Sequence, residues 1–283
     1  MIKIGDTISS RYNVLSHLGT GGMAEVFQCK DLYTSKIVAV KILKEELLNN
    51  KNSISDFEKE VKASVAMSHE NIMEIFDEGK FENRPYLVME YFNSQTLLDK
   101  IEYYTKFSIN EACLIMIQLL KAIGYTHKHG IIHRDIKPQN IFYLSNGSIK
   151  LGDFGIAKKE GDNEIDGEIL GSIHYLAPEV LTNKKFSISS DIYAAGITFF
   201  QLITGTLPFE GSTKEIAEKQ VKSNFPKPSS IINETPKDID LIVLKAVSKD
   251  PKARYKNTDE FIKEIEDYLS GKKIKRSFFD RFF

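Results

Sequence analysis

The pattern of hydrophobic and polar positions changes along this chain of 283 residues. The first third contains short apolar runs that are typical of strands, at 12–15, 36–43 and 85–92. A helical period appears once in this part, at 53–67, where Phe57, Val61 and Val65 fall on one face. From residue 94 onward, helical periods dominate. The pattern predicts a strand-rich part with one main helix, followed by a mostly helical part.

The mostly helical part begins with a clear helix start. Ser108 and Glu111 have the spacing of a capping box, and Gly130 suits the end of the same helix. The buried face of this helix is predicted to contain Cys113, Met116, Leu120 and Ile123. A later apolar stretch at 193–203 is interrupted by polar residues and glycine. It is too short to span a membrane, which takes about 20 residues, and predicts a buried helix instead.

Gly19, Gly21 and Gly22 lie close together between two predicted strands. A hairpin with such a tip lets another molecule approach its backbone closely, and the N–H groups there suit phosphate oxygens. A plain β-turn explains the same glycines equally well. The glycines alone leave both interpretations open.

Lys41 lies inside the apolar run 36–43. A lysine in a buried strand is costly unless an anion meets it, although a lysine whose ammonium reaches water is the more usual case. Glu60 lies beside the apolar face of the predicted helix at 53–67. A Lys41–Glu60 pair would neutralise both groups and leave the ammonium directed at a phosphate.

The segment 133–140, with the sequence HRDIKPQN, carries more functional groups than an ordinary turn needs. Apolar pairs on both sides indicate a rigid loop between two strands. The spacing suits an Asp135 that handles a hydroxyl, a Lys137 that meets a phosphate and an Asn140 that meets a metal ion.

Asp153 follows this loop after a predicted hairpin whose turn is Asn146-Gly147. On its own, Asp153 is most simply a turn residue. Its position one hairpin after the loop favours a second metal ligand close to Asn140.

Composition and charge narrow the possible partners. The chain has 38 basic and 39 acidic residues, a formal charge of −1, which argues against nucleic acid as the main partner. The two cysteines, Cys29 and Cys113, have no metal-ligand spacing and indicate a reducing compartment. No run of about 18 apolar residues predicts a membrane span, and the N-terminus has no apolar signal core.

Together these residues resemble the protein kinase family. The motifs that carry the resemblance are Gly19-x-Gly21 with Val26, Val38-Ala39-Val40-Lys41, Glu60, the 133–140 loop, Asp153-Phe154-Gly155 and Ala177-Pro178-Glu179. They occur in the order of the family, and the likeness covers about 12–269. Finer features are similar to bacterial serine/threonine kinases that carry external PASTA repeats; these features lie at 21–26, 130–138, 243–246 and 250–255.

The resemblance implies an α+β fold with two lobes: a small antiparallel sheet lobe with one main helix, and a larger, mostly helical lobe. The implied boundaries are an N-terminal lobe at 1–88, a hinge at 89–93, a C-terminal lobe at 94–271 and a tail at 272–283. The implied function is Mg-dependent transfer of the γ-phosphate of ATP to serine and threonine hydroxyls of proteins, in bacterial signalling.

The resemblance also implies a role for each matching residue. The ATP-binding residues would be Leu18, Gly19, Thr20, Gly21, Gly22, Met23, Ala24, Val26, Ala39, Lys41, Met89, Glu90, Phe92, Asn140, Phe142 and Asp153. The catalytic residues would be Asp135, Lys137, Lys41 and Glu60, and the ligands of Mg²⁺, or of Mn²⁺ in its place, would be Asn140 and Asp153. Asp191 would brace the 133–140 loop, and Glu179 would pair with Arg254.

Within that scheme, Asp135 would orient and deprotonate the substrate hydroxyl, and Lys137 would neutralise the γ-phosphate. Met89 would lie at the back of the adenine pocket. The adenine would bond to the Glu90 carbonyl and the Phe92 N–H, and the side chains that sandwich the ring would be Val26, Ala39 and Phe142.

The sequence departs from the family pattern in places. Ala24 replaces the third glycine of the phosphate-binding turn, and Ile136 replaces a leucine. Between Asp153 and Glu179 the only hydroxyl side chain of serine or threonine is Ser172, at a position that shapes the substrate site in relatives. The same segment carries Glu160, Asp162, Glu164, Asp166 and Glu168. One of these carboxylates could dock near Arg134 in place of an activating phosphate, but a solvated acidic loop is the more usual outcome.

The tail at 272–283 contains basic residues and four phenylalanines. A disordered end is the simplest interpretation, and weak contact with an anionic membrane surface or a partner groove is the alternative. The expected partners are ATP and protein substrates, without nucleic acid, with a homodimer through the smaller lobe as a further option. The expected location is the cytoplasm, with membrane association as an alternative. Two rival functions stay open: a kinase-fold scaffold that binds nucleotide without phosphotransfer, and a small-molecule phosphotransferase.

Overall fold

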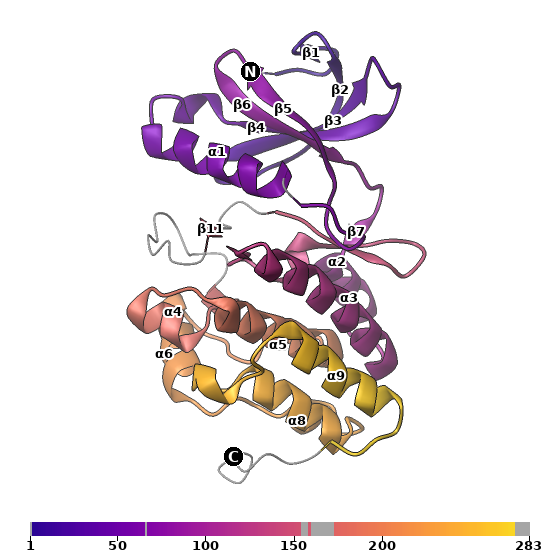
Figure 1. Cartoon of the computed structure of the whole chain (residues 1–283), viewed down its shortest axis with the longest axis vertical. Coiled ribbons are helices and arrows are strands. Elements are labelled where there is room, and N and C mark those ends of the chain that lie inside the picture. Colours follow the sequence, from indigo (N-terminus) through magenta and orange to yellow (C-terminus); the bar gives the residue numbers. More distant parts are fainter. Residues whose placement is uncertain (1, 66, 154–157, 160–172, 275–283) are drawn as a thin grey trace. The chain divides into compact units, whose positions relative to one another are not determined.

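The computed structural model describes residues 2–65, 67–153, 158–159 and 173–274 (Figure 1). The chain divides into two compact units. Unit 1 comprises Met1–Asn93 with Phe154–Lys158, and unit 2 comprises Ser94–Asp153 with Lys159–Phe283.

Unit 1 is built on an antiparallel sheet with the strand order β1-β2-β3-β4-β6-β5 (Figure 1). The strands are β1 (Thr7–Ile8), β2 (Tyr12–Thr20), β3 (Ala24–Asp31), β4 (Ile37–Leu43), β5 (Ile75–Phe81) and β6 (Arg84–Glu90). Neighbouring strands in this order are mostly consecutive in the chain, so short turns suffice to join them. The helical elements of this unit are η1 (Glu45–Leu47) and α1 (Lys51–Val65).

The two faces of this sheet pack differently. One face forms a core that includes Tyr12, Phe27, Val40 and Val88, all buried. On the other face, Phe57 and Val61 of α1 pack with buried residues of three strands; these are Ala24, Leu43 and Leu87. Alternation along each strand explains this division, because successive side chains point to opposite faces.

Unit 2 is mostly helical (Figure 1). Its helices are α2 (Leu97–Tyr104), α3 (Ile109–Lys128), α4 (Pro178–Asn183), α5 (Ile188–Thr204), α6 (Thr213–Lys222), α7 (Pro228–Ile231), α8 (Lys237–Ala246) and α9 (Thr258–Leu269). Its short strands are β7 (Gln95–Thr96), β8 (Ile131–Ile132), β9 (Ile141–Tyr143) and β10 (Ile149–Leu151), and β11 is Lys158–Lys159. The 3₁₀ turns are η2 (Pro138–Asn140), η3 (Ile173–Tyr175) and η4 (Pro251–Ala253).

Helix α5 forms the centre of unit 2, and almost every residue of it is buried. Gly196 allows α8 to come close, because a Cβ at this position would lie 2.7 Å from the Cβ of Ala246 and 2.8 Å from Cγ1 of Val247. Gly124 of α3 makes the same kind of approach to Thr258, the first residue of α9. A helix that is apolar on all sides belongs in such an interior.

The structure confirms the predicted α+β fold with a sheet lobe and a helical lobe. The predicted helix at 53–67 runs from Lys51 to Val65, and the capping box of Ser108 and Glu111 starts α3 as expected. The predicted strand at 85–92 ends earlier, at Glu90, because Tyr91 and Phe92 make no strand pairing. Among the described residues, no helix is long and apolar enough to cross a membrane.

Candidate active site

In unit 1, strands β2 and β3 form the predicted glycine-rich hairpin. Gly19 pairs with Val26, and the N–H of Gly21 donates to the carbonyl of Ala24 at 2.8 Å. A Cβ added at Gly19 or Gly22 would meet no atom within 4 Å, and neither residue has a positive φ. Packing within the unit therefore does not explain these glycines, which favours close approach by another molecule.

Four predicted site residues lie on the same face of the unit 1 sheet. Val26 pairs with Lys41 across β3 and β4, and Ala39 pairs with Met89 across β4 and β6. Cross-strand partners share a face, and residues two apart in one strand share it as well. Val26, Ala39, Lys41 and Met89 therefore point to one side, the side on which α1 packs.

Lys41 is half-buried. Glu60 lies in α1, which covers this face, but the Glu60 side chain lies outside the described part of the structure. The Lys41–Glu60 pair stays a prediction.

Several other predicted ATP-binding residues flank this face. Leu18, Thr20 and Met23 lie in or beside the hairpin, and Leu18 is exposed. Glu90 ends β6, where its N–H donates to the carbonyl of Glu74 at 2.9 Å. Glu90 and Phe92 are both half-buried and lie at the end of this strand and just beyond it.

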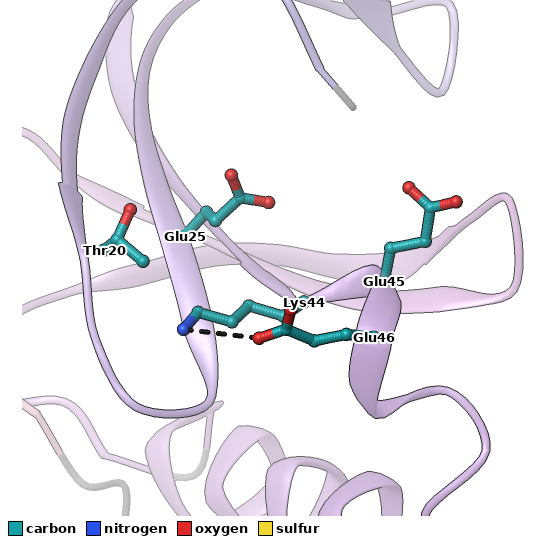
Figure 2. Close-up of a pocket in the computed structure, with 5 residues that line it drawn as sticks. All are labelled: Thr20, Glu25, Lys44, Glu45 and Glu46. Carbon is teal, nitrogen blue, oxygen red and sulfur yellow. Dashed lines mark ion pairs between the residues drawn. The ribbon is translucent and has the colours of Figure 1, made fainter.

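A pocket of about 630 Å³ lies on unit 1 beside the hairpin (Figure 2). It is lined by Thr20, Glu25, Lys44, Glu45 and Glu46, and Lys44 pairs with Glu46 at 3.7 Å. Glu25 is also bound, at 2.8 Å, by the buried guanidinium of Arg84. Because carboxylates predominate, this pocket does not suit a phosphate, and only Thr20 connects it to the predicted ATP site.

In unit 2, the loop between β8 and β9 brings three of the predicted groups into direct contact. The carboxylate oxygen Oδ2 of Asp135 accepts a bond from Nδ2 of Asn140 at 2.8 Å and lies 2.7 Å from Nζ of Lys137. Nδ2 of Asn140 also donates to the Asp135 carbonyl at 2.8 Å. Pro138 opens η2, which turns the chain between Lys137 and Asn140.

A buried carboxylate on α5 holds this loop by its backbone. Oδ2 and Oδ1 of Asp191 accept the N–H groups of His133 and Arg134 at 2.9 and 3.0 Å. Nε2 of His127 lies 2.8 Å from Asp191 Oδ2 and must donate, because a carboxylate only accepts. Burial opposes ionisation of Asp191, but these bonds and the nearby histidines lower its pKa overall. The bracing role that the resemblance implied for Asp191 is confirmed.

His133 connects the loop to the chain before Asp153. Its Nδ1 accepts the N–H of Asp135 at 3.3 Å, and its Nε2 lies 3.3 Å from the Gly152 carbonyl. This arrangement fits the neutral tautomer with the proton on Nε2. Burial lowers the pKa of His133 below its ordinary value, which keeps the ring neutral.

Asp153 lies next to Asn140 through the backbone, because the Gly152 N–H donates to the Asn140 carbonyl at 2.9 Å. Asp153 is exposed and has a φ of +56°, and Arg134 has a φ of +70°. Seven other described non-glycine residues also have a positive φ, in turns and at helix ends, so this backbone alone does not distinguish a metal ligand from a turn residue. Strand β9, which follows Asn140, carries Phe142. This residue pairs with Lys150 of β10 and is half-buried.

Asn140 and Asp153 fit a hard divalent cation. Asn140 uses its amide nitrogen toward Asp135, so its side-chain oxygen is the atom suited to a metal ion. Among the described residues, no group of three or more His, Cys, Asp or Glu side chains could hold a metal. Two protein oxygens suffice for Mg²⁺, which keeps several waters and binds substrate phosphates as well.

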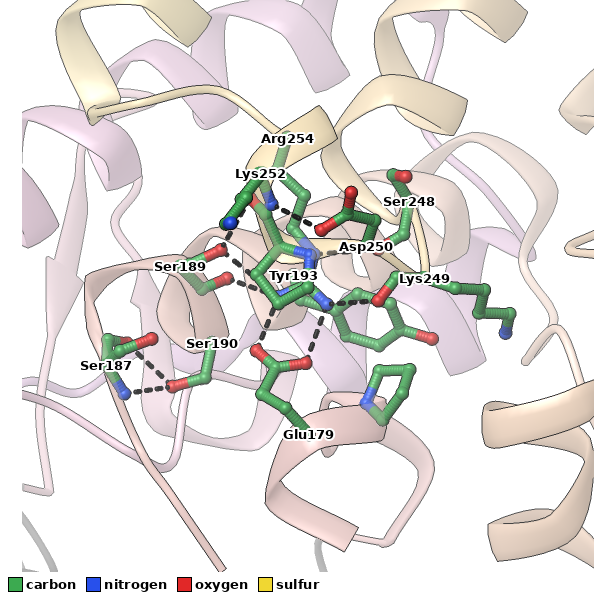
Figure 3. Close-up of polar contacts among 12 residues, drawn as sticks. Glu179, Ser187, Ser189, Ser190, Tyr193, Ser248, Lys249, Asp250, Lys252 and Arg254 are labelled. Atoms are coloured by element: carbon green, nitrogen blue, oxygen red, sulfur yellow. Dashed lines mark hydrogen bonds and ion pairs between the residues drawn. The ribbon is translucent and has the colours of Figure 1, made fainter. Parts of the chain in front are cut away.

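A second polar cluster lies deeper in unit 2 (Figure 3). The guanidinium of Arg254 makes two bonds of 2.7 Å to the Glu179 carboxylate and donates to the carbonyls of Ser189 and Ser248 at 2.8 and 2.7 Å. The Arg254 side chain is fully buried. The ion pair that the resemblance implied is therefore confirmed, and it joins α4, α5 and η4.

Three contacts in unit 2 carry no signal in the sequence pattern. His127 is a polar residue in the last turn of α3, where nothing in the pattern signals a bond to Asp191. Phe186 lies under the Arg134 guanidinium at 4.9 Å. Gln220 of α6 bonds the Tyr193 hydroxyl. Ser172 and the acidic run 160–168 lie outside the described residues, so the hypothesis of a docked carboxylate stays a prediction.

Comparisons with known proteins identify the family of the chain. The family described as the protein kinase domain matches residues 12–267. The probable serine/threonine-protein kinase PknB of Lactococcus lactis is 38% identical over 269 residues, which cover 94% of this chain and 43% of that protein. The serine/threonine-protein kinase PrkC of Bacillus subtilis is 37% identical over 279 residues, which cover 98% of this chain and 43% of that protein. The chain thus spans about two fifths of the length of these relatives. This chain belongs to the protein kinase domain family.

Proposed function

We propose that this chain is a serine/threonine protein kinase domain that transfers the γ-phosphate of ATP to protein hydroxyls. The observation that carries the proposal is the Asp135 carboxylate, in contact with Lys137 and Asn140 on a loop braced by Asp191. Protein kinases use ATP and a divalent metal ion. The names of the bacterial relatives support serine and threonine as acceptors.

Asp135 is the group that orients the substrate hydroxyl and accepts its proton. Its carboxylate is held by two neighbours, so it keeps one direction without having to reorganise. Lys137 brings a positive charge to the same point and stabilises negative charge on the transferred group. In tyrosine kinases this position usually differs, so Lys137 supports serine and threonine specificity.

Asn140 and Asp153 are the proposed ligands of Mg²⁺, with Mn²⁺ as an alternative. When bound, the metal ion neutralises the charge of the phosphates. The support for Asp153 is its exposure and its closeness to Asn140, given by the backbone bond from Gly152 to the Asn140 carbonyl.

Unit 1 supplies the proposed nucleotide-binding groups. The hairpin backbone from Gly19 to Gly22 binds phosphate oxygens, and Lys41, supported by Glu60, binds the α- and β-phosphates. On the sheet face that holds Lys41, the apolar surface for the adenine ring comes from Val26 and Ala39, with Met89 beside them. Phe142 is the proposed apolar group of unit 2 for the same ring.

The rival function is a kinase-fold scaffold that binds nucleotide without chemistry. The complete set of Lys41, Glu60, Asp135, Asn140 and Asp153 favours catalysis, because a scaffold does not require all five. The Ala177-Pro178-Glu179 segment, anchored by Arg254, favours a protein substrate over a small molecule.

Lobe boundaries at residues 88, 93 and 271, a homodimer through the smaller lobe and a cytoplasmic location are further proposals that rest on the family resemblance.

The proposed activity is tested by incubating the chain with ATP and Mg²⁺, alone and with a generic protein substrate, followed by phosphopeptide mass spectrometry. We expect phosphate on serine and threonine of both proteins, and none in a matched incubation with EDTA. Phosphate on tyrosine alone, or nucleotide binding without any transfer, would refute the proposal. Treating the chain with a phosphatase beforehand tests the hypothesis of a docked carboxylate, which predicts that activity persists; loss of activity would refute it.

A further inference from the structure

Unit 2 contains a second cavity, of about 220 Å³, away from the 133–140 loop. Its walls come from the start of α3, the end of α5 and the turn before α8. The apolar residues that line it are Phe107, Ile109, Ile203 and Ile232. None of these residues belongs to the proposed catalytic machinery.

A buried hydroxyl lines this cavity without a hydrogen-bond partner. Thr235 is only 5% exposed, and among the described residues its Oγ1 has no partner. Its backbone N–H is satisfied by the Ile232 carbonyl at 2.9 Å, so the turn that carries it is well formed. A buried hydroxyl without a partner costs free energy, which a carbonyl of an incoming ligand would recover.

The rim of the cavity is both apolar and charged. Ile232 contributes an apolar side chain to the lining, whereas its neighbour Ile231 is exposed and lies outside the lining. Lys106 and Glu234 line the opening with charges of opposite sign. The rim therefore suits a segment that carries apolar and charged residues together.

The end of helix α9 lies close to this cavity. Helix α9 packs on both α3 and α8, and it runs antiparallel to α3, because its first residue meets Gly124 near the end of α3. At the other end of α9, burial raises the pKa of Tyr268, and the charges of Cys113 and Asp238 raise it further. Cys113 and Asp238 lie in the first turns of α3 and α8, which border the cavity.

We propose that this cavity binds a phenylalanine side chain of the chain's own segment 275–283, through Phe278 or Phe279. Packed helices lie about 8–10 Å apart, so the cavity is roughly one helix spacing from the end of α9. Nine residues lead from Leu269, the last residue of α9, to Phe278 and can extend over about 30 Å, which is enough to reach it. Among the charged residues of the segment, Arg276 complements Glu234, and Asp280 complements Lys106.

The size of the cavity favours a side chain over a free ligand. Pockets for drug-sized molecules have volumes of about 300–1,000 Å³, and this cavity is smaller. An aromatic ring is a single large apolar group with little rotamer entropy to lose, and the backbone carbonyl beside it can accept a bond from Thr235.

The chain contains no tryptophan, which permits a clean fluorescence test. Phe278→Trp and Phe279→Trp are made separately in the full chain, and the emission maximum and acrylamide quenching of each are measured. We expect at least one probe to emit at shorter wavelength and to be quenched several-fold less than free N-acetyltryptophanamide. If both probes behave like the free compound, the proposal is wrong.

Two further variants locate the binding site. Ile232→Lys places a charge in the cavity wall and is expected to shift the shielded probe to longer wavelength. Ile231→Lys makes the same change one residue away, outside the cavity lining, and is expected to leave the probe shielded. If the two lysine variants have the same effect on the probe, the segment binds elsewhere and the proposal fails. The proposal fails as well if the probe is shielded only after anionic lipid vesicles are added.

A second, independent test changes only the segment 275–283 and leaves the cavity residues as they are. Phe278→Ala/Phe279→Ala in the full chain is compared with the unmodified chain by hydrogen–deuterium exchange. We expect faster exchange in the variant at 106–109 and 231–236, with no change at 131–141. Equal exchange at the first two segments would contradict the proposal.

Discussion

At the scale of single residues, the geometry of the 133–140 loop depends on Asp191. Its two carboxylate oxygens accept three donors from the end of α3 and from the loop. Because the bonds to the loop go to backbone N–H groups, they set the path of the chain without using the side chains of His133 and Arg134. The side chain of Arg134 instead stacks on Phe186.

Asp191→Asn is expected to lower both stability and turnover. Asparagine has one acceptor oxygen where aspartate has two. Its NH₂ group would therefore face one of the donors that Asp191 accepts, and that buried donor would lose its partner. The expected loss is about 1–3 kcal/mol in the free energy of unfolding, measured by denaturant titration. Displacement of the loop is expected to lower kcat about 10- to 100-fold.

Asp240→Asn is the matched control, because Asp240 is also a buried carboxylate of unit 2 and bonds the backbone N–H and hydroxyl of Ser229. We expect Asp240→Asn to lower the free energy of unfolding by a similar amount and to leave kcat unchanged. If Asp191→Asn keeps full turnover, Asp191 has no positioning role.

The buried ring of His133 predicts a loss of stability in mild acid. Burial lowers the folded-state pKa of His133 below the unfolded value of about 6.5, so the unfolded chain binds more protons. The stability contributed by the neutral ring is present above pH 6.5 and is lost as the pH falls below it. Denaturant midpoints measured at pH 7.5 and 5.5 check this.

His133→Gln is expected to reduce the drop between the two pH values, since glutamine does not titrate. His129→Gln, at an exposed position, is expected to leave the drop unchanged. An equal drop in both variants would mean that His133 does not control it.

At the scale of elements, the sequence patterns predicted which helices and strands exist better than they predicted how these elements pack on one another. The apolar runs indicated the strands, and the capping box placed the start of α3 at Ile109. Alternation alone does not tell which face of β4 meets α1. That follows from the register of β3, β4 and β6, a long-range property that no local pattern contains. The site residues followed from motifs, whereas His127 and Phe186 carry no local signal.

Packing of α5 on α8 provides a prediction at this scale. Gly196→Ala places a methyl group closer to Ala246 and Val247 than van der Waals contact allows and is expected to cost about 1–3 kcal/mol of unfolding free energy. Adding Ala246→Gly moves one methyl group from α8 to α5 and is expected to restore part of the loss. Denaturant titration of the two single variants and the double variant completes the cycle. Strict additivity would contradict a direct contact.

The Glu179–Arg254 pair joins α4, α5 and η4 and gives a second prediction. Glu179→Ala leaves a fully buried guanidinium without its carboxylate and is expected to cost about 3–5 kcal/mol, seen in the denaturant midpoint. Glu264→Ala removes a carboxylate that pairs with the partly exposed Lys245 and is expected to cost less. Equal losses in the two variants would argue against a special role for the buried pair.

At the scale of the whole molecule, each unit carries its own part of the proposed chemistry. Unit 1 holds the glycine hairpin and the sheet face with Lys41, and unit 2 holds Asp135, Lys137, Asn140 and Asp153. Family membership is shown across most of the chain, and the longer relatives contain as much sequence again and more beyond this region. The central claim, that Asp135 accepts the proton of the substrate hydroxyl, concerns unit 2 alone and is tested there.

The most direct test is the rate of phosphate transfer from ATP to a serine- and threonine-containing protein substrate by Asp135→Asn. The proposed proton acceptor is lost, so we expect the rate to fall about 10²- to 10⁴-fold, while ATP binding measured by calorimetry stays within a few-fold of the unmodified chain. Asp99→Asn, which changes an exposed carboxylate at the start of α2, is expected to keep the full rate. A fully active Asp135→Asn variant would contradict the proposed mechanism.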